Sequence, residues 1–179
     1  MTSRDPHLVA ARIVQDAGGS VVGRTRMQKI TYLSQLAGFP AQFAFEYRHY
    51  GPFSEDLAAG LEIASALGPL REEERPSDWG GTYSIYSLRQ PAEPTDPVRA
   101  AFLEKAKSIG AIELELAATA AFLFAEEGVG KNGQGNPWHE TRERKPQKSA
   151  DGRLERAATA YAELRRLDAP MPLPALPSP

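Results

Sequence analysis

Apolar residues recur at helical spacing in the first third of the chain and predict two helices. Asp5 and Pro6 form a helix-start signal, because Asp caps free amides and Pro is well suited to the first helical position. The first helix is expected to run to Gly18-Gly19. Met27, Ile30 and Leu33 share one face of a second helix over residues 25–37. Within it, Thr25 and Gln28 fit a capping box.

A change to alternating polarity predicts a strand after the second helix. Phe43, Phe45 and Tyr47 alternate with polar or small residues, which indicates a short half-buried strand ending at a Gly51-Pro52 turn. Ser54 is then the expected cap of a third helix. Residues 70–75 and 82–88 flank Gly- and Pro-containing sequence and predict a β-hairpin with a long tip. This order is typical of a winged-helix-like unit.

The rest of the chain has mainly helical periodicity. Residues 90–97 contain three prolines and read as a linker, after which apolar spacing predicts helices up to residue 168. Residues 128–149 are expected to form a polar loop. We therefore predict a mainly α protein with a small β-hairpin. A winged-helix-like half over residues 1–90 and a helical half over residues 91–168 form one compact unit, followed by a disordered Pro-rich tail over residues 169–179.

Composition excludes several classes of chemistry. The 179 residues contain no cysteine and only three histidines, so thiol chemistry is excluded and we expect neither a metal nor a cofactor. The start of the chain has no basic segment followed by an apolar run, and no apolar stretch is long enough to span a bilayer. We therefore expect a cytoplasmic protein without a membrane partner. The net charge of −2 gives no overall attraction to nucleic acid.

Sequence motifs for catalysis are weak. Residues 128–133 match G-x-G-x-x-G, but they follow a helix and enter a loop, whereas a dinucleotide fingerprint needs a preceding strand. No serine lies in a nucleophile motif. The Pro137-Trp138-His139 stretch could form a polar site, although Trp138 is more simply a packing anchor. We therefore expect no catalytic or metal site.

Two short segments resemble the YwgA-like and Panacea-domain families. Members of these families carry a helix with a Gln-Lys pair followed by Tyr, and a Tyr-Gly-Pro turn before an acidic helix start. The residues that match these motifs or the later family elements are Gln28, Lys29, Tyr32, Tyr50, Gly51, Pro52, Thr119, Lys145 and Pro146. The resemblance covers about residues 7–168. The chain departs from both families at Met27, in a Gly-rich insertion over residues 128–136, and in its Pro-rich tail.

The resemblance implies a binding role. The Panacea domain is an antitoxin module that neutralises toxins by contact, and its relatives include a protease adaptor. We therefore expect a non-enzymatic, antitoxin-like or adaptor-like module whose partner is a protein, such as a toxin or a phage-related protein. The candidate partner-binding residues are Arg26, Lys29, Arg48, Tyr50 and Phe53. A solvated basic face is the alternative interpretation of Arg26 and Lys29.

Two other functions remain open at this stage. The first is a winged-helix DNA-binding transcriptional regulator, which is disfavoured because Glu55 and Asp56 begin the helix that would approach DNA and Glu72-Glu73-Glu74 make the hairpin acidic. The second is an enzyme of unknown chemistry. The sequence does not specify the oligomeric state or the identity of the partner.

Overall fold

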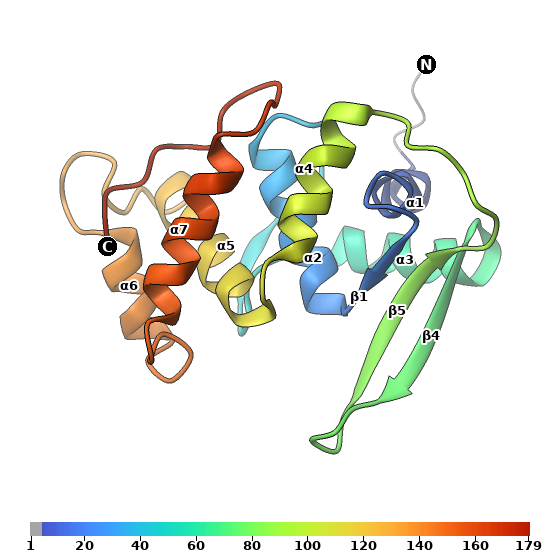
Figure 1. Ribbon diagram of the computed structural model, residues 1–179, viewed down its shortest axis with the longest axis horizontal. Coiled ribbons are helices and arrows are strands. Elements are labelled where there is room, and N and C mark those ends of the chain that lie inside the picture. The colour runs from blue at the N-terminus through green and yellow to red at the C-terminus, as the bar shows by residue number, and fades with distance from the viewer. Residues whose placement is uncertain (1–4) are drawn as a thin grey trace.

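The computed structural model describes residues 5–179, with seven helices and five strands (Figure 1). The helices are α1 (Pro6–Asp16), α2 (Arg24–Leu36), α3 (Glu55–Leu67), α4 (Pro97–Ser108), α5 (Ala111–Ala125), α6 (Pro137–Arg144) and α7 (Arg153–Arg165). The strands are β1 (Ser20–Val22), β2 (Glu46–Arg48), β3 (Gly51–Phe53), β4 (Leu70–Pro76) and β5 (Thr82–Leu88).

The strands form two small antiparallel sheets. One has the order β1-β5-β4, with Val21 opposite Tyr86 and Glu73 opposite Ile85. The other is the β2–β3 hairpin. About 49% of the chain is helix and 13% is strand, so the prediction of a mainly α protein with one small hairpin is wrong. The fold is α/β. The prediction missed β1, whose three residues are too few for a period of two to be recognised, and β3, whose Gly51 and Pro52 were interpreted as a turn.

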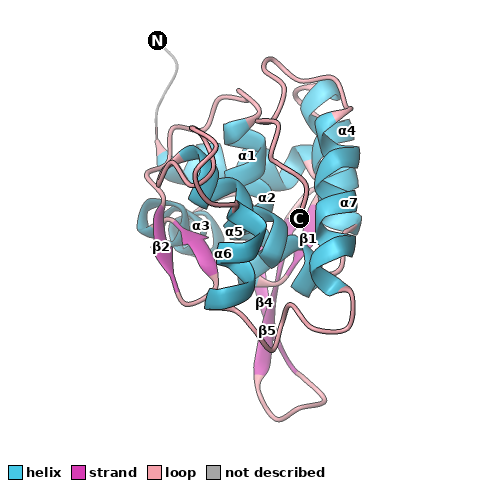
Figure 2. Cartoon of the chain, turned by 90° about the vertical axis from the view of Figure 1, so that its left-hand side faces the viewer, coloured by secondary structure: helices cyan, strands magenta, loops and turns pink. Residues whose placement is uncertain are grey.

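The predicted N-terminal helices are present with different ends, but the strand expected over Phe43 to Tyr47 begins only at Glu46, and the expected Gly51-Pro52 turn is part of β3, because the chain turns at His49 and Tyr50. Ser54 caps α3 through its side chain, which accepts a hydrogen bond from the Leu57 amide, as predicted. The capping box at Thr25 is absent, because α2 begins after Gly23 and has no side-chain cap. The other expected member of the capping box, Gln28, is buried, and its side chain hydrogen-bonds the backbone of Ser54 instead. The β4–β5 hairpin extends below the helices (Figure 2).

The C-terminal elements contain two departures from the predictions. Residues 137–144 form α6 inside the expected polar loop, with Asn136 capping the Trp138 amide. The Pro-rich tail was expected to be disordered, yet it packs on the fold. Leu173 is 1% exposed, and the Tyr161 hydroxyl donates to the Pro174 carbonyl. Pro in a packed tail restricts φ, which lowers the entropy lost when the segment is ordered.

The hydrophobic core is continuous across both halves of the chain. It joins α1, α2 and α3 to α4, α5 and α7. Helix α2 lies in the middle of the molecule and is buried over residues 27–34 (Figure 1). Within residues 5–179 no single helix is long and apolar enough to cross a membrane, and the α4–α5 pair that passes this test jointly is bent by 118°.

Candidate functional site: a buried lysine cluster below the β2–β3 hairpin

The motif residues of α2 hold the β2–β3 hairpin and the start of α3. The Gln28 side-chain amide donates to the Ser54 carbonyl at 3.0 Å and its oxygen accepts from the Ser54 amide at 2.8 Å. The Lys29 Nζ donates to the Pro52 carbonyl at 2.7 Å. Both side chains are buried, so the adjacent Gln and Lys satisfy backbone groups that would otherwise lose their hydrogen bonds on burial.

Gly51 brings the hairpin against α5. Its φ angle of +88° lies in the region that favours glycine, and an added Cβ would lie 2.4 Å from the Thr119 Oγ1. Thr119 is fully buried, and its hydroxyl has no hydrogen-bond partner among the described residues. A small side chain at position 119 and no side chain at position 51 therefore permit this close approach.

Two lysines from the segment after α6 complete the cluster around one glutamate. The Lys145 Nζ donates to the Glu115 Oε1 at 2.8 Å and to the His49 carbonyl at 2.9 Å. The Lys148 Nζ reaches both carboxylate oxygens of Glu115, at 2.8 and 2.7 Å. Glu115 is 4% exposed and Lys145 is 7% exposed, so the ion pair is sealed between α5 and the hairpin. Breaking such a pair leaves a buried charge without its partner.

Burial and charge together weaken the basicity of Lys29. Burial disfavours the ammonium form and lowers the Lys29 pKa from 10.5 to about 7, Glu115 opposes this shift, and Lys145 and Lys148 reinforce it. Lys29 is therefore charged in only part of the molecules at neutral pH. The cluster contains three lysines and one carboxylate, that of Glu115. It therefore carries an excess of positive charge below the hairpin.

Aromatic residues pack beside the cluster, where the Lys145 Nζ lies 6.0 Å from the centroid of the Tyr47 ring. Tyr32 packs edge-on against Phe45, with 5.1 Å between ring centroids, and lies 5.7 Å from the ring of Phe122. Tyr47 contacts the same Phe122 ring and lies below the guanidinium of Arg144. The Tyr32 hydroxyl is buried without a partner among residues 5–179, and burial raises its pKa strongly.

The predicted partner-binding residues divide into two groups. Lys29 is 1% exposed and cannot reach a partner in this arrangement. Arg26 also points inward, and its guanidinium donates to the Lys107 and Ile109 carbonyls at 2.8 and 2.6 Å, where α4 ends. Lys29 is therefore corrected as a partner-binding residue, whereas Arg26 is only partly buried and its guanidinium is engaged by these backbone carbonyls.

Arg48, Tyr50 and Phe53 lie together on the β2–β3 hairpin. Tyr50 is 57% exposed, and the Arg48 guanidinium lies 4.9 Å from the centroid of the Phe53 ring. The sequence did not place Lys148 with these residues, but its ammonium lies 4.7 Å from the centroid of the Tyr50 ring. We call Arg48, Tyr50, Phe53 and Lys148 the hairpin surface.

The other candidate chemistry has a structural explanation. Trp138 is 1% exposed and packs edge-on against Tyr161, which confirms its predicted role as a packing anchor. The Gly-rich segment over residues 128–135 forms turns between α5 and α6, with no strand before it. Within residues 5–179, no three side chains of the metal-binding types are grouped closely enough to hold a metal ion.

One curated protein shares detectable sequence similarity with half of the chain. No family model matches. The uncharacterised protein YwgA of Bacillus subtilis (strain 168) is 31% identical over 85 residues, which are 47% of this chain and 49% of that protein. The match therefore spans about half the length of this relative. The similarity confirms the predicted resemblance to the YwgA-like family.

Proposed function

We propose that this chain is a non-enzymatic protein-interaction module that binds a protein partner through the hairpin surface. The observation that carries the proposal is the exposed ring of Tyr50, which lies in the turn of a two-stranded hairpin whose neighbouring backbone groups are held by buried side chains. Tyr and Arg are enriched among the residues that dominate binding energy at interfaces.

The support for this proposal is the preorganisation of the hairpin. Its backbone carbonyls at His49 and Pro52 accept from buried lysines, and Gly51 is fixed against Thr119. An isolated two-stranded hairpin is marginally stable in water, so these anchors hold a conformation that the segment would otherwise populate only in part. A surface fixed before binding loses less conformational entropy when a partner docks.

The hairpin surface also offers suitable charge. The Arg48 guanidinium pairs with Glu46 and Glu55, and all three side chains are exposed. Exposed ion pairs contribute little stability, so a partner carboxylate or backbone carbonyl can replace one of them at low cost. Lys148 keeps about a third of its side chain exposed beside Tyr50, which adds a second cation to the same surface.

An antitoxin-like or adaptor-like role, with a toxin or a phage-related protein as the partner, extends this proposal. Its support is the resemblance of the Gln28-Lys29 helix and the Tyr50-Gly51-Pro52 turn to the Panacea domain. These motif residues build the scaffold of the hairpin, which is consistent with a family that shares a binding surface and varies its partners.

Photo-crosslinking in the source cell tests the proposal and captures the partner in the same step. A benzophenone amino acid is placed at Tyr50 in one protein and at Leu67, which is 89% exposed on α3, in a matched control. Irradiation should give a specific crosslinked protein from position 50 that is absent from position 67. Identical crosslinking patterns from both positions would contradict the proposal.

A further inference from the structure

An exposed tryptophan lies at the end of the β4–β5 hairpin. We call the turn of residues 77–81, which joins the two strands, the β4–β5 tip. Trp79 is 83% exposed, whereas Trp138, the other tryptophan of the chain, is 1% exposed in the core. Tryptophan has a large apolar area and is enriched among the residues that anchor interfaces. The position of Trp79 therefore makes the β4–β5 tip a candidate contact with another molecule.

The β4–β5 tip is ordered by its own hydrogen bonds. The Ser77 amide and hydroxyl donate to the Gly81 carbonyl at 2.8 and 2.9 Å, and the hydroxyl accepts from the Gly81 amide at 3.2 Å. The Gly80 amide donates to the Ser77 carbonyl, also at 3.2 Å. These bonds close the turn around Trp79 and hold its backbone in one conformation, which lowers the entropy lost on binding.

The β4–β5 tip projects away from the helices. Strands β4 and β5 have seven residues each, so at roughly 3.3 Å per residue the tip lies about 20 Å from the base of the hairpin. Figures 1 and 2 both show the hairpin extending below the helices, on the side opposite to the start of α4. Trp79 is therefore too far from that end of its own chain to contact it, and a contact there has to come from a second molecule.

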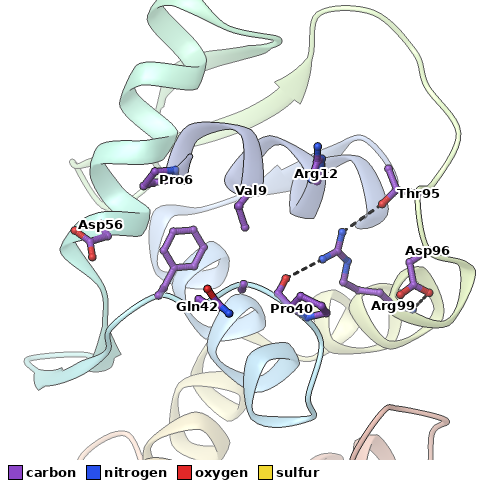
Figure 3. Close-up of a pocket in the computed structure, with 11 residues that line it drawn as sticks. Pro6, Val9, Arg12, Pro40, Gln42, Asp56, Thr95, Asp96 and Arg99 are labelled. Atoms are coloured by element: carbon purple, nitrogen blue, oxygen red, sulfur yellow. Dashed lines mark hydrogen bonds between the residues drawn. The ribbon is translucent and has the colours of Figure 1, made fainter. Parts of the chain in front are cut away.

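The opposite end of the molecule contains an apolar groove. It has a volume of about 940 Å³ and is bounded by α1, by the segment between α2 and β2, and by the starts of α3 and α4 (Figure 3). We call it the α1–α4 groove. Its apolar lining comes from Pro6, Val9, Pro40, Ala41 and Phe43. This volume is near the upper end of the range for ligand clefts, about 300–1,000 Å³, and leaves room for an indole ring.

One cation of the groove is engaged inside the fold and another is available. The Arg99 Nε lies 2.7 Å from the Asp16 Oδ2. The same guanidinium donates to the Pro40 carbonyl and to the Thr95 hydroxyl, both at 3.3 Å (Figure 3). Arg12, on the α1 side of the groove, is exposed and forms no ion pair within the described part of the chain. Arg12 is therefore the charge that can pair with an acidic group of an incoming segment.

The β4–β5 tip carries the matching charge. Asp78 directly precedes Trp79, is exposed, and pairs with no charged side chain of residues 5–179. Asp56 lies at the other end of the groove from Arg99 (Figure 3) and would repel a second carboxylate. Charge therefore favours one direction of entry, with Asp78 beside Arg12. Complementary charges of this kind fix the register of a contact as well as its partner.

The wall of the groove offers acceptors for the indole N–H. The Gln35 side chain bonds both the amide and the carbonyl of Phe43, each at 2.8 Å, and so fixes this wall. The neighbouring Ala41 and Gln42 carbonyls accept no hydrogen bond from the described residues. A tryptophan N–H usually finds a partner when the ring is buried. The groove therefore supplies both an apolar surface for the ring and an acceptor for its polar edge.

We propose that the α1–α4 groove binds the β4–β5 tip of a second copy of this chain. The Trp79 ring covers Val9 and Phe43, and its Nε1 donates to a backbone carbonyl of the wall. Asp78 pairs with Arg12. Each copy has one tip and one groove, so the contact is reciprocal in a two-fold dimer or continues from copy to copy. A buried Trp covers only about 150–250 Å², so the association is weak and reversible. The contact uses no residue of the hairpin surface and is independent of the proposed function.

Fluorine NMR of the full-length protein follows the two tryptophans separately. Fluorotryptophan is incorporated at both positions, and the Trp79→Phe variant identifies the Trp79 signal. Raising the protein concentration from about 10 µM to about 1 mM, the range expected for a small interface, should shift the Trp79 signal and leave the Trp138 signal in place. Sedimentation velocity on the same samples should show the accompanying rise in mass. A Trp79 signal that does not move over this range overturns the proposal.

Charge reversal tests whether the groove receives the tip. Arg12→Glu and Asp78→Arg should each weaken self-association about tenfold, because an attractive exposed pair becomes a repulsive one. An equimolar mixture of the two variants should recover the association, since each tip then meets a groove of opposite charge. Arg166→Glu, an equal change in charge at the exposed end of α7, should associate like the parent.

Two results of the charge reversal overturn the proposal. One is association that is unchanged in both single variants, and the other is a mixture that associates no more tightly than either variant alone. Circular dichroism first confirms that each variant is folded. If Arg12→Glu does not fold, the neutral Arg12→Gln decides, because it should weaken association about threefold.

Discussion

Gly51 and Thr119 approach so closely that a Cβ atom on Gly51 would lie 2.4 Å from the Thr119 hydroxyl oxygen. The contact joins the β2–β3 hairpin to α5 without a hydrogen bond between the two side chains. The contact therefore gives a second physical reason, besides the backbone conformation, for the glycine of the Tyr-Gly-Pro motif. The position needs glycine both for its positive φ angle and for the space that Thr119 occupies.

The Gly51→Ala variant should therefore lose more stability than a change to alanine at another glycine with positive φ. We expect a loss of about 2–5 kcal/mol, the sum of a left-handed backbone conformation and an overpacked contact. Gly128→Ala is the matched control, because Gly128 has a φ of +76° and no atom within 4 Å of an added Cβ. It should lose about 1–2 kcal/mol. Urea unfolding of both variants measures the difference, and equal losses would show that the Thr119 contact relaxes freely.

The pKa of Lys29 predicts how stability depends on pH. A folded-state pKa of about 7, compared with 10.5 for an ordinary lysine, means that the unfolded chain binds more protons between pH 7 and pH 10.5. The Lys29 contribution to the free energy of unfolding therefore rises with pH in this window, by at most about 1.4 kcal/mol per pH unit. Lys29→Met removes this contribution. Urea unfolding at pH 7, 8 and 9 should show a steeper rise for the parent than for the variant, and parallel curves would contradict the prediction.

The buried face of α2 gives a direct test of the core. Ile30 is fully buried, so Ile30→Asp places an unpaired charge in the interior and should lower the free energy of unfolding by more than about 4 kcal/mol. Thr25→Asp introduces the same side chain in the first turn of the same helix, where a negative charge is favourable. It should change stability by less than about 1 kcal/mol. Circular dichroism during thermal unfolding distinguishes the two, and an unchanged melting temperature for Ile30→Asp contradicts this packing.

The periodic apolar residues were sufficient to predict the positions of most helices. Met27, Ile30 and Leu33 are fully buried as the spacing predicted, and Ser54 caps α3. The same reasoning placed Lys29 at the surface, because charged residues are usually exposed. Helix α2 is surrounded by other elements, and backbone carbonyls that are buried against it need hydrogen-bond donors from its side chains. Lys29 donates such a bond to the Pro52 carbonyl. This requirement depends on tertiary structure and is not visible in the spacing.

The other errors also came from long-range contacts. Helix α6 has only eight residues and a polar composition, so its apolar contacts, mainly Trp138, were too few to give a period. The Pro-rich tail is ordered because its Leu173 enters the core and its backbone accepts from Tyr161 and Arg165. The groove could not be predicted, because it is assembled from segments as distant in sequence as Val9 and Arg99.

Weak binding to DNA is expected from the charges on α3 and on the β4–β5 hairpin. Glu55 and Asp56 are exposed in the first turn of α3, and Glu73 and Glu74 are largely exposed on β4. These carboxylates repel phosphates, so binding to random duplex at physiological salt should be no tighter than about 10⁻⁴ M. Fluorescence anisotropy with a labelled duplex measures this affinity. A submicromolar dissociation constant would instead favour a DNA-binding regulator.

The central claim is that a protein partner binds the hairpin surface. The most direct measurement is isothermal titration calorimetry with the purified partner that the crosslinking experiment identifies. The parent is compared with Tyr50→Ala, Arg48→Ala and the exposed control Leu67→Ala. Circular dichroism first confirms that each variant is folded. If the claim is correct, Tyr50→Ala weakens binding by about 2 kcal/mol or more, as expected for an interface hot spot, whereas Leu67→Ala binds like the parent. Folded hairpin variants that all bind within about twofold of the parent would contradict it.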